Sequence, residues 1–333
     1  MIKNQENEHP VKVLCEVCGI GPSSYYRWKG QKGQTARECE DEQLSTEIRS
    51  SWERSRRNYG RPRILTDLRN QGIKTSGKRV DRLMKQEGIQ GRYNRRKKPL
   101  VTDSRHGKRI SENKLKDAPF PTGPRQVIVA DTTYVWTDQG WYYLATVMDL
   151  FTREILGWSF SGNNDRHLVC QALWNASSEL TGKEPIIHHS DRGSPYCSDK
   201  YRNLMKSFGL ESSMSAKGSC YDNAHMESFF GSLKSECRAL EKRLPPEQVR
   251  LALFGYIEGF YNTHRIHTAL EGLSPRQFAQ KTTGITSGGL FVSSSPTSYN
   301  PILEEDPITH QKSQQHPCGM TVIKSNIDQL PLT

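Results

Sequence analysis

The chain has 333 residues, enough for one large domain or for two to three ordinary domains with a hydrophobic core. Its longest apolar run, residues 141–145, is far shorter than the roughly 20 residues that span a bilayer. The first ten residues are polar, and eight cysteines are too few for a disulfide framework. These features argue against a membrane-spanning or disulfide-rich secreted protein and predict a cytoplasmic one.

The net charge is +11, and the positive excess is confined to the first third of the chain. Residues 1–125 carry 29 Lys and Arg against 15 Asp and Glu, whereas residues 126–333 carry 18 against 21. A basic segment joined to a nearly neutral body favours a polyanionic partner, most simply nucleic acid. A basic surface that only confers solubility is the alternative that charge alone leaves open.

Two helical units are predicted in the first 90 residues. Residues 1–42 contain an apolar-periodic segment, a Gly-Ile-Gly turn and a second short helix, the pattern of a helix-turn-helix region. Cys15 and Cys18 form a lone CxxC, for which core packing is favoured over zinc because no second ligand pair follows. Residues 43–90 predict a helical DNA-binding domain with three helices: one from Leu44 to Arg57, one from Arg61 to Asn70, and a third that Ser76 caps.

Basic side chains gather on the last of these helices and in the segment that follows it. Lys78, Arg79 and Arg82 suit a helix that lies against DNA, although a charged, solvated face is nearly as good an interpretation. Residues 91–124 form a basic linker, and phosphate contact is the natural use of its charges. Its candidates for DNA contact are Arg95, Arg96, Lys97 and Lys98.

Residues 125–284 change from helical to mixed character. Three β-rich runs follow one another as a meander, and two helices then alternate with two further strands, which predicts a mixed α/β sheet. Helices return around Glu227 and continue over 245–264 and from Ser274. The last stretch, 285–333, is polar without periodicity, and we expect it to be a disordered tail.

Three acidic residues stand where such a fold displays functional groups. Asp131 and Asp191 each follow an apolar strand, and a strand end lies at the sheet edge where sites in α/β folds form. Glu227 lies on a predicted helix and shares one helical face with Asn223 and Lys234. Three such carboxylates suit hard divalent cations, and two ions about 3.5–4 Å apart can promote phosphoryl transfer. A helix cap or a salt bridge is the alternative for any one acid.

Four segments resemble the catalytic core of DDE transposases and retroviral integrases, most closely the OrfB-type transposases of insertion sequence family three: ADTTYVWT, VMDLFTREILGW, HHSDRGSPYCS and SAKGSCYDNAHMESFFGSLKSE. Thirty-five residues separate Asp191 from Glu227, which is the family's spacing between its second acid and its glutamate. Lys234 matches the basic residue seven positions after that glutamate. Including weaker similarities at 15–28, 56–89 and 261–278, the resemblance covers about residues 11–282.

The resemblance implies an RNase H-like fold, mixed α/β, preceded by an all-α helix-turn-helix DNA-binding region. It implies that Asp131, Asp191 and Glu227 form a catalytic triad that binds two Mg²⁺ or Mn²⁺ ions. The implied activity is strand cleavage at the ends of a mobile element and transfer of the 3′-hydroxyl into target DNA. Asn223 and Lys234 would approach the DNA near the cut. The implied partners are double-stranded DNA, further copies of the chain on that DNA, and an upstream-frame protein or fusion, in the bacterial cytoplasm and on its nucleoid.

Several nearby residues are given other roles. Asp149 lacks the glutamate spacing that would make it the second acid, and Asp222 is expected to cap the helix of Glu227. His188 and His189 are expected to be structural, or to hydrogen-bond to metal ligands, rather than to be metal ligands themselves. A catalytically inactive DNA-binding regulator or transposase remnant is the main alternative function, and an RNase H-type nuclease acting on hybrids is a second.

Overall fold

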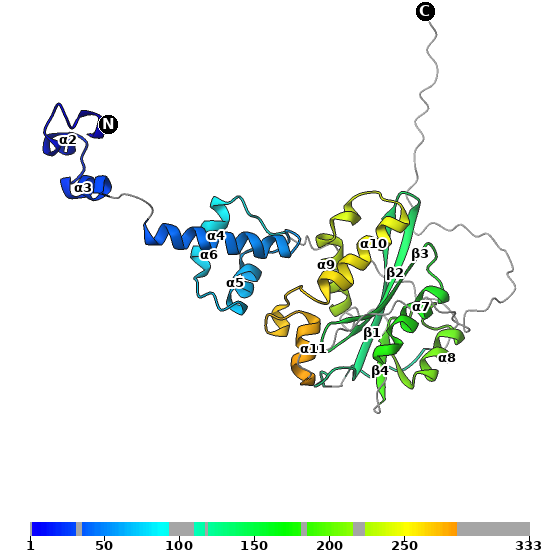
Figure 1. Cartoon of the computed structure of the whole chain (residues 1–333). Helices are drawn as coiled ribbons and strands as arrows, with labels where there is room; N and C mark the ends of the chain where they lie inside the picture. Colours follow the sequence, from blue (N-terminus) through cyan, green and yellow to red (C-terminus); the bar gives the residue numbers. More distant parts are fainter. Residues whose placement is uncertain are drawn as a thin grey trace, which may run out of the picture. The chain divides into compact units, whose positions relative to one another are not determined.

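The computed structural model describes residues 2–30, 35–92, 110–116, 119–180, 185–215 and 224–284 (Figure 1). The first helices are α1 (Ile2–Gln5), α2 (Val11–Val17) and α3 (Pro22–Gly30), so the predicted helix pair is present. Ile2, Cys15 and Tyr25 form their small core. Cys15 is buried but Cys18 is exposed, so the interpretation of the CxxC as two core cysteines is right only for Cys15.

Three longer helices follow: α4 (Ala36–Arg54), α5 (Arg61–Asn70) and α6 (Gly77–Gln86). The helix expected from Leu44 begins well before that residue, at Ala36. The reason is a capping box, in which the Thr35 hydroxyl accepts from the Glu38 amide and the Glu38 carboxylate accepts from the Thr35 amide. The charged first turns of α4 have no apolar periodicity, so pattern analysis missed them. As predicted, the Ser76 side chain caps α6.

A five-stranded sheet in the order β3-β2-β1-β4-β5 confirms the mixed α/β fold class (Figure 1). β1 pairs antiparallel with β2, and β2 with β3, as the predicted meander requires. β4 runs parallel to both β1 and β5. The strands are β1 (Val127–Thr137), β2 (Gly140–Asp149), β3 (Ile155–Ser161), β4 (Ile186–Ser190) and β5 (Leu210–Met214).

The expectation that Asp131 follows the end of a short strand is wrong. β1 continues to Thr137, because its second half pairs with β2, Asp131 lying opposite Thr146. The parallel ladder between β1 and β4, however, stops at the pair Ala130–Ser190. Asp131 therefore lies inside one strand and directly beyond the end of the parallel pairing.

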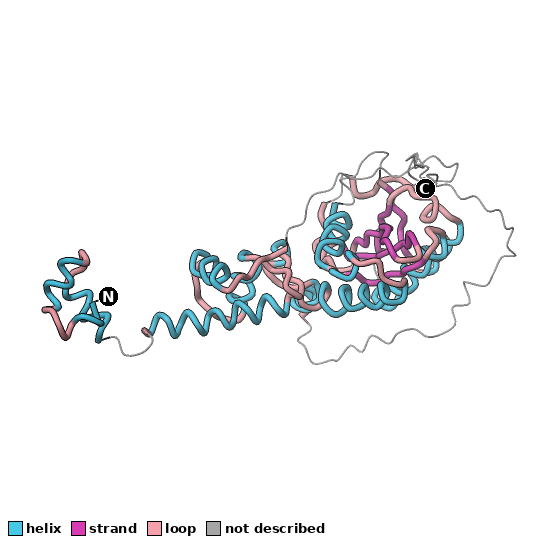
Figure 2. Tube along the Cα trace, turned by 90° about the horizontal axis from the view of Figure 1, so that it is seen from above, coloured by secondary structure: helices cyan, strands magenta, loops and turns pink. Residues whose placement is uncertain are grey.

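The two faces of β1 have separate cores. Ile128 and Ala130 pack in a cluster with α7 (Arg166–Ala176) and α8 (Asp199–Ser207), on the side where Figure 1 shows these helices. Side chains on the opposite face of β1, such as Val127 and Val129, pack with α9 (Ala224–Glu236) and α10 (Pro246–Tyr256). The strands thus lie between layers of helices (Figure 2). The last helix is α11 (Pro275–Thr283).

Contacts join α4–α6 to the α9–α10 side of the core. The Tyr59 hydroxyl donates to the His264 carbonyl at 3.1 Å and accepts from the Ile266 amide at 2.7 Å. The Arg56 guanidinium donates to the Gly255 carbonyl at 2.7 Å. Buried residues of α4–α6 and of α9–α10 belong to one hydrophobic cluster, so the two regions share a packed interior.

Candidate active site

Asp131 and Asp191 are neighbours across the β1–β4 ladder. Ala130 pairs with Ser190, and each acid is the next residue of its chain. Neighbouring strands are about 4.8 Å apart, so the register brings the two carboxylate-bearing residues side by side. Both side chains are partly buried.

Backbone groups hold Asp191 in place. The Gly193 amide donates to Asp191 Oδ1 at 2.8 Å, and the Arg192 Nε donates to the Ser215 carbonyl at 2.7 Å. A Cβ atom added to Gly193 would lie 2.9 Å from Asp191 Oδ1, closer than real Cβ contacts. Glycine at position 193 is therefore a condition for this placement of the Asp191 carboxylate.

The surroundings of Asp131 favour its neutral form. Removal from water and then the charge of Asp191 raise its pKa to about 8, and Glu227 adds to the rise. The Thr132 amide, which donates to Asp131 Oδ1 at 2.7 Å, and the ammonium of Lys234 act in the opposite direction. Asp131 therefore lies within electrostatic range of both other predicted acids and of Lys234.

Glu227 and Lys234 are displayed by α9. Met226, Phe229 and Leu233 are buried against the core and fix the helix, whereas Glu227, in the first turn, and Lys234, in the last turn, are exposed. The Lys234 ammonium lies 4.3 Å from the centroid of the Tyr134 ring. Two of the other residues predicted at this end of the helix, Asp222 and Asn223, lie outside the described residues.

The three acids provide the type of ligand atom that a divalent cation binds. Carboxylate oxygens are the ligands that Mg²⁺ prefers, and a cation nearby would offset both the burial and the charge of Asp191, which raise the pKa of Asp131. Among the residues that the structure describes, no three His, Cys, Asp or Glu side chains are close enough together to hold an ion as they stand. Glu227, whose effect on Asp131 is smaller than that of Asp191, would have to approach the other two.

Asp149 has a structural role, in accord with its exclusion from the triad. It is fully buried at the end of β2 and accepts from the Thr152 hydroxyl at 2.6 Å and from the Arg125 amide at 3.2 Å. The Arg125 guanidinium also pairs with Asp149, at 3.4 Å. These contacts satisfy the carboxylate inside the protein.

The two histidines before Asp191 are buried and hydrogen-bonded to neighbouring side chains. His188 Nε2 lies 2.8 Å from the Tyr201 hydroxyl. The two ring nitrogens of His189 lie 2.9 and 3.1 Å from the hydroxyls of Ser213 and Ser215. Burial lowers the pKa of His188 to about 4. Both histidines therefore serve the packing of β4, as predicted.

The predicted DNA-contacting side chains on α6 divide into two kinds. Arg79 and Arg82 both pair with Asp41 of α4, at 2.6 Å, and Arg79 also pairs with Glu40. Lys78 is exposed on the same helix. The remaining predicted contacts lie outside the described residues: Arg95, Arg96, Lys97 and Lys98.

Sequence reasoning missed an ion-pair network at the end of α9. The buried Glu236 accepts from Arg265 twice at 2.8 Å, from the Tyr256 hydroxyl at 2.9 Å and from Arg63 of α5 at 3.1 Å. These partners lie 20 to 173 positions away in sequence, so no local pattern joins them. The network fixes the helix that carries Glu227.

A second missed feature is an exposed group of aromatic residues on the β1–β2 hairpin. We define the aromatic patch as Tyr134, Trp136 and Trp141, whose side chains are 43%, 37% and 47% exposed. The available signal was the sequence YVWTDQGW, in which aromatic residues alternate along a strand and cross a turn. The patch begins three residues beyond Asp131 on the same strand.

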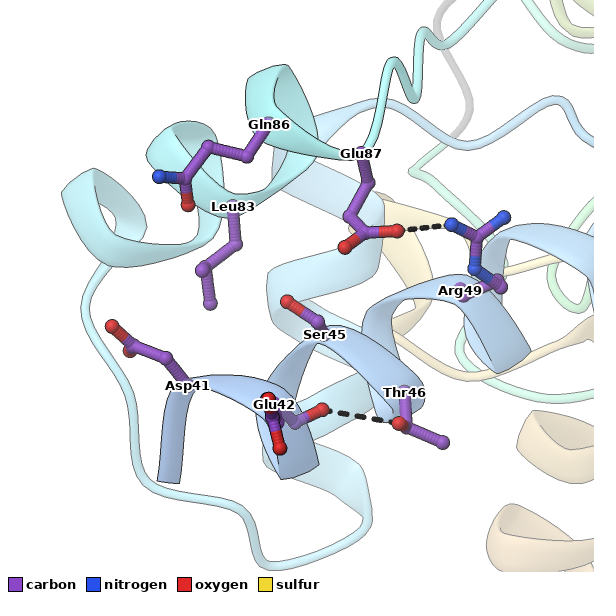
Figure 3. Close-up of a pocket in the computed structure, with 8 residues that line it drawn as sticks. All are labelled: Asp41, Glu42, Ser45, Thr46, Arg49, Leu83, Gln86 and Glu87. Carbon is purple, nitrogen blue, oxygen red and sulfur yellow. Dashed lines mark hydrogen bonds and ion pairs between the residues drawn. The ribbon is translucent and has the colours of Figure 1, made fainter. Parts of the chain in front are cut away.

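An open hollow of about 580 Å³ lies between α4 and α6 (Figure 3), and its lining residues are far in sequence from Asp131, Asp191 and Glu227. Its carboxylates include Asp41, which is paired with arginines of α6, and Glu87, which is paired with Arg49. An acidic lining of this kind does not suit DNA.

None of the described helices is long and apolar enough to cross a bilayer.

Family models match most of the described chain. An HTH-like domain matches residues 38–97, and integrase core domain models match residues 121–220 and 227–283. Among solved structures, the HTLV-2 integrase catalytic core domain in complex with magnesium is 18% identical, with a TM-score of 0.38, and covers 47% of this chain and 98% of that one. A simian T-cell lymphotropic virus intasome chain is 15% identical, with a TM-score of 0.41, over 72% and 73% of the two chains.

Curated relatives match over nearly their whole length. The transposase InsF for insertion sequence IS3A of Escherichia coli is 38% identical over 281 residues, which cover 84% of this chain and 97% of the relative. The 31 kDa protein of insertion element IS600 from Shigella sonnei is 39% identical over 80% of this chain and 98% of its own. The order of an HTH-like domain and an integrase core, together with this level of identity, shows that the chain belongs to the IS3 family of insertion-sequence transposases.

Proposed function

We propose that this transposase cleaves DNA strands at the ends of its element and joins them to target DNA through a DDE triad of Asp131, Asp191 and Glu227. The observation that carries the proposal is the placement of Asp131 beside Asp191, within electrostatic range of Glu227 and Lys234. Such a group of carboxylates at the end of a parallel ladder is suited to phosphoryl transfer.

Two displacements at phosphorus make up the reaction. In the first, a water oxygen attacks the phosphorus at the element end, the bond from phosphorus to the 3′-oxygen breaks, and a 3′-hydroxyl and a 5′-phosphate result. In the second, this 3′-hydroxyl attacks a phosphodiester of the target, and the new ester bond replaces the bond to the target's own 3′-oxygen. The protein contributes positioning and charge stabilisation.

The residues around the scissile phosphate have separate tasks. Asp131, Asp191 and Glu227 would hold two Mg²⁺ or Mn²⁺ ions, which when bound would activate the attacking hydroxyl and stabilise the leaving oxygen. Lys234, on the face of α9 that carries Glu227, would contact a phosphate near the cut, and Asn223 would lie close to the same DNA. Arg192 and Gly193 keep Asp191 in position.

The remainder of the chain would bind and align DNA. We assign DNA binding to residues 1–42 and 43–90, phosphate contact to the basic linker 91–124, and the chemistry to residues 125–284. Two element ends have to meet in one complex, so self-association on DNA is part of the proposal, and an upstream-frame partner or fusion would complete that complex. The 285–333 tail lies outside the described residues and is given no role.

The test is a cleavage and joining assay with end-labelled DNA from the flanks of the element, in Mg²⁺, Mn²⁺ or EDTA. Wild-type protein should nick the 3′ end in the presence of metal only, and Glu227→Gln should not. Glu247→Gln is the matched control, because Glu247 is also an exposed acid in the first turn of a helix, α10. The control should cleave like the wild type.

Three outcomes would count against the proposal. Cleavage by Glu227→Gln would show that the triad assignment is wrong. Sequence-specific binding without cleavage, also after addition of the upstream-frame protein, would favour the inactive regulator. Preference for RNA–DNA hybrids over element ends would favour an RNase H-type nuclease.

A further inference from the structure

The rings of the aromatic patch contact one another and are also exposed to solvent. Trp136 and Trp141 face each other across the β1–β2 ladder with ring centroids 4.5 Å apart, and Tyr134 lies 5.0 Å from Trp141. All three rings nevertheless keep more than a third of their surface exposed. A contiguous group of exposed large rings on a folded domain is the usual mark of a binding surface.

Positive side chains stand over two of the three rings. The Lys234 ammonium lies 4.3 Å from the centroid of Tyr134, and the guanidinium carbon of Arg243 lies 5.7 Å from that of Trp136. Rings interleaved with cations are the surface that single-stranded nucleic acid binds, because bases stack on the rings and phosphates pair with the cations. An apolar protein partner would have no use for the two charges.

The patch is close to the proposed chemistry. The Cα atoms of Asp131 and Tyr134, three residues apart on β1, are about 10 Å apart at roughly 3.3 Å per residue, and the odd spacing places their side chains on opposite faces of the strand. Lys234 acts electrostatically on Asp131 and also lies over Tyr134, so it links the two places. At roughly 3.4 Å per stacked nucleotide, 10 Å corresponds to about three nucleotides.

We propose that the aromatic patch stacks unpaired bases within about three nucleotides of the phosphate held at the triad. This inference rests on the proposed function, since the triad defines which phosphate is meant. Bases in a duplex have both faces covered by their neighbours, so a ring reaches a base face only where pairing has opened. The patch would therefore hold the DNA end open beside the cut.

Binding can be tested without cleavage, by fluorescence anisotropy with a labelled 12-nucleotide oligothymidylate and with a 30-base-pair blunt duplex, both in EDTA. Trp141→Leu should weaken oligothymidylate binding about five-fold or more, the range for loss of one stacked base, and change duplex binding less than two-fold. Trp141→Phe should retain single-strand binding, because phenylalanine still presents a ring. Phe254→Leu is the control, because Phe254 is another exposed ring, 51% exposed, on α10 outside the patch.

A second measurement places the patch at the cut. Duplex ends carry 2-aminopurine at one to five nucleotides from the cleaved phosphate, and stacking on the patch should change its fluorescence at positions one to three in the wild type but not in Trp141→Leu. Trp141→Leu should cleave fully paired ends poorly. A mismatch that opens these positions should restore its cleavage. Thermal melting confirms that each variant is folded.

The two proposals can fail separately. If Trp141→Leu binds oligothymidylate as the wild type does, or loses duplex binding to the same extent, the patch does not stack bases, whatever the cleavage result. If the wild type does not cleave in any metal but Trp141→Leu selectively loses single-strand binding, the patch binds bases and the catalytic proposal fails.

Discussion

Arg63 of α5 donates to Glu236 at 3.1 Å, and Glu236 is the last residue of α9, the helix that carries Glu227. The same carboxylate is held by Arg265, whose side chain is only 5% exposed. A residue of the HTH-like region and a residue of the integrase core thus share one buried acid. The position of α9 is tied to both regions through Glu236.

Replacement of Arg265 by methionine should lower the free energy of unfolding by about 3–5 kcal/mol, because Glu236 would remain buried without its main partner. Burial by itself raises the pKa of Glu236, but the hydrogen bonds and charge of Arg265 help to lower it by more. The pKa is therefore below its usual value, and the acid is ionised in the native state. Urea unfolding measures the loss. Arg276→Met is the control: Arg276 pairs with Glu154 and Glu258 but is 39% exposed, and about 1 kcal/mol or less is expected. Equal losses would contradict the anchoring role.

Mg²⁺ should raise the melting temperature of the wild type and not that of Asp131→Asn. A ligand that binds only the native state stabilises it, by about 2.7 kcal/mol at a concentration 100 times its Kd. Differential scanning calorimetry with Mg²⁺ or EDTA gives the difference, and Ca²⁺ provides a non-catalytic comparison. A Mg²⁺ shift of the same size in Asp131→Asn would place the ion elsewhere.

Gly193→Ala should abolish cleavage with little loss of stability. The added Cβ would meet Asp191 Oδ1 at 2.9 Å and displace the carboxylate, whereas the fold around it is otherwise unchanged. Strand cleavage and urea unfolding are measured together. Gly30→Ala is a matched control, because a Cβ at Gly30 meets nothing within 4 Å. Wild-type activity in Gly193→Ala would show that the position of Asp191 is not critical.

Stability should fall as the pH drops from 6.5 towards 4, in part because of His188. Burial lowers the pKa of this side chain to about 4, while the unfolded chain binds the proton near pH 6.5. In that window the unfolded state holds more protons, so the free energy of unfolding decreases with decreasing pH, by up to about 3 kcal/mol for this group. His188→Asn should flatten the profile. The exposed His167→Asn should leave it unchanged; equal profiles for wild type and His188→Asn would refute the assignment.

Lys78→Ala should weaken DNA binding, whereas Arg79→Ala should mainly weaken the packing of α6 on α4. Lys78 is exposed, and loss of one phosphate contact should reduce the slope of log affinity against log salt by about 0.9. Arg79 is engaged by Asp41 and Glu40, and its loss should lower the stability only slightly, because exposed ion pairs contribute little. Salt-dependent binding to element ends separates the two. An unchanged salt slope in Lys78→Ala would contradict the DNA contact.

Local patterns predicted the elements whose signals are local. α5 spans the predicted residues because its apolar side chains repeat at helical spacing, and the Ser76 cap marks the start of α6. The start of α4 was missed because a capping box of Thr35 and Glu38, rather than apolar periodicity, sets it. The length of β1 was underestimated because polar residues 131–134 are held in the strand by pairing with β2.

The sequence was enough to propose the three acids, but it could not predict their surroundings. The spacing and flanks of Asp191 and Glu227 pointed to them, whereas the register that places Asp191 beside Asp131 depends on the pairing of β1 with β4. Ion pairs such as Arg63–Glu236 and Arg79–Asp41 join residues far apart in the chain. Only the fold determines which charges meet, and hence which arginines are engaged within the protein.

The backbone holds the three proposed site residues to different degrees. Asp131 sits on backbone that is hydrogen-bonded to β2, and Asp191 directly follows a strand paired on both sides, so little conformational entropy remains to be lost there. Glu227 depends on the placement of a single helix. Under the proposed triad, substitutions at the far end of α9 would therefore change the catalytic rate without touching any of the three acids, which would give such an element a route to tune its own mobility.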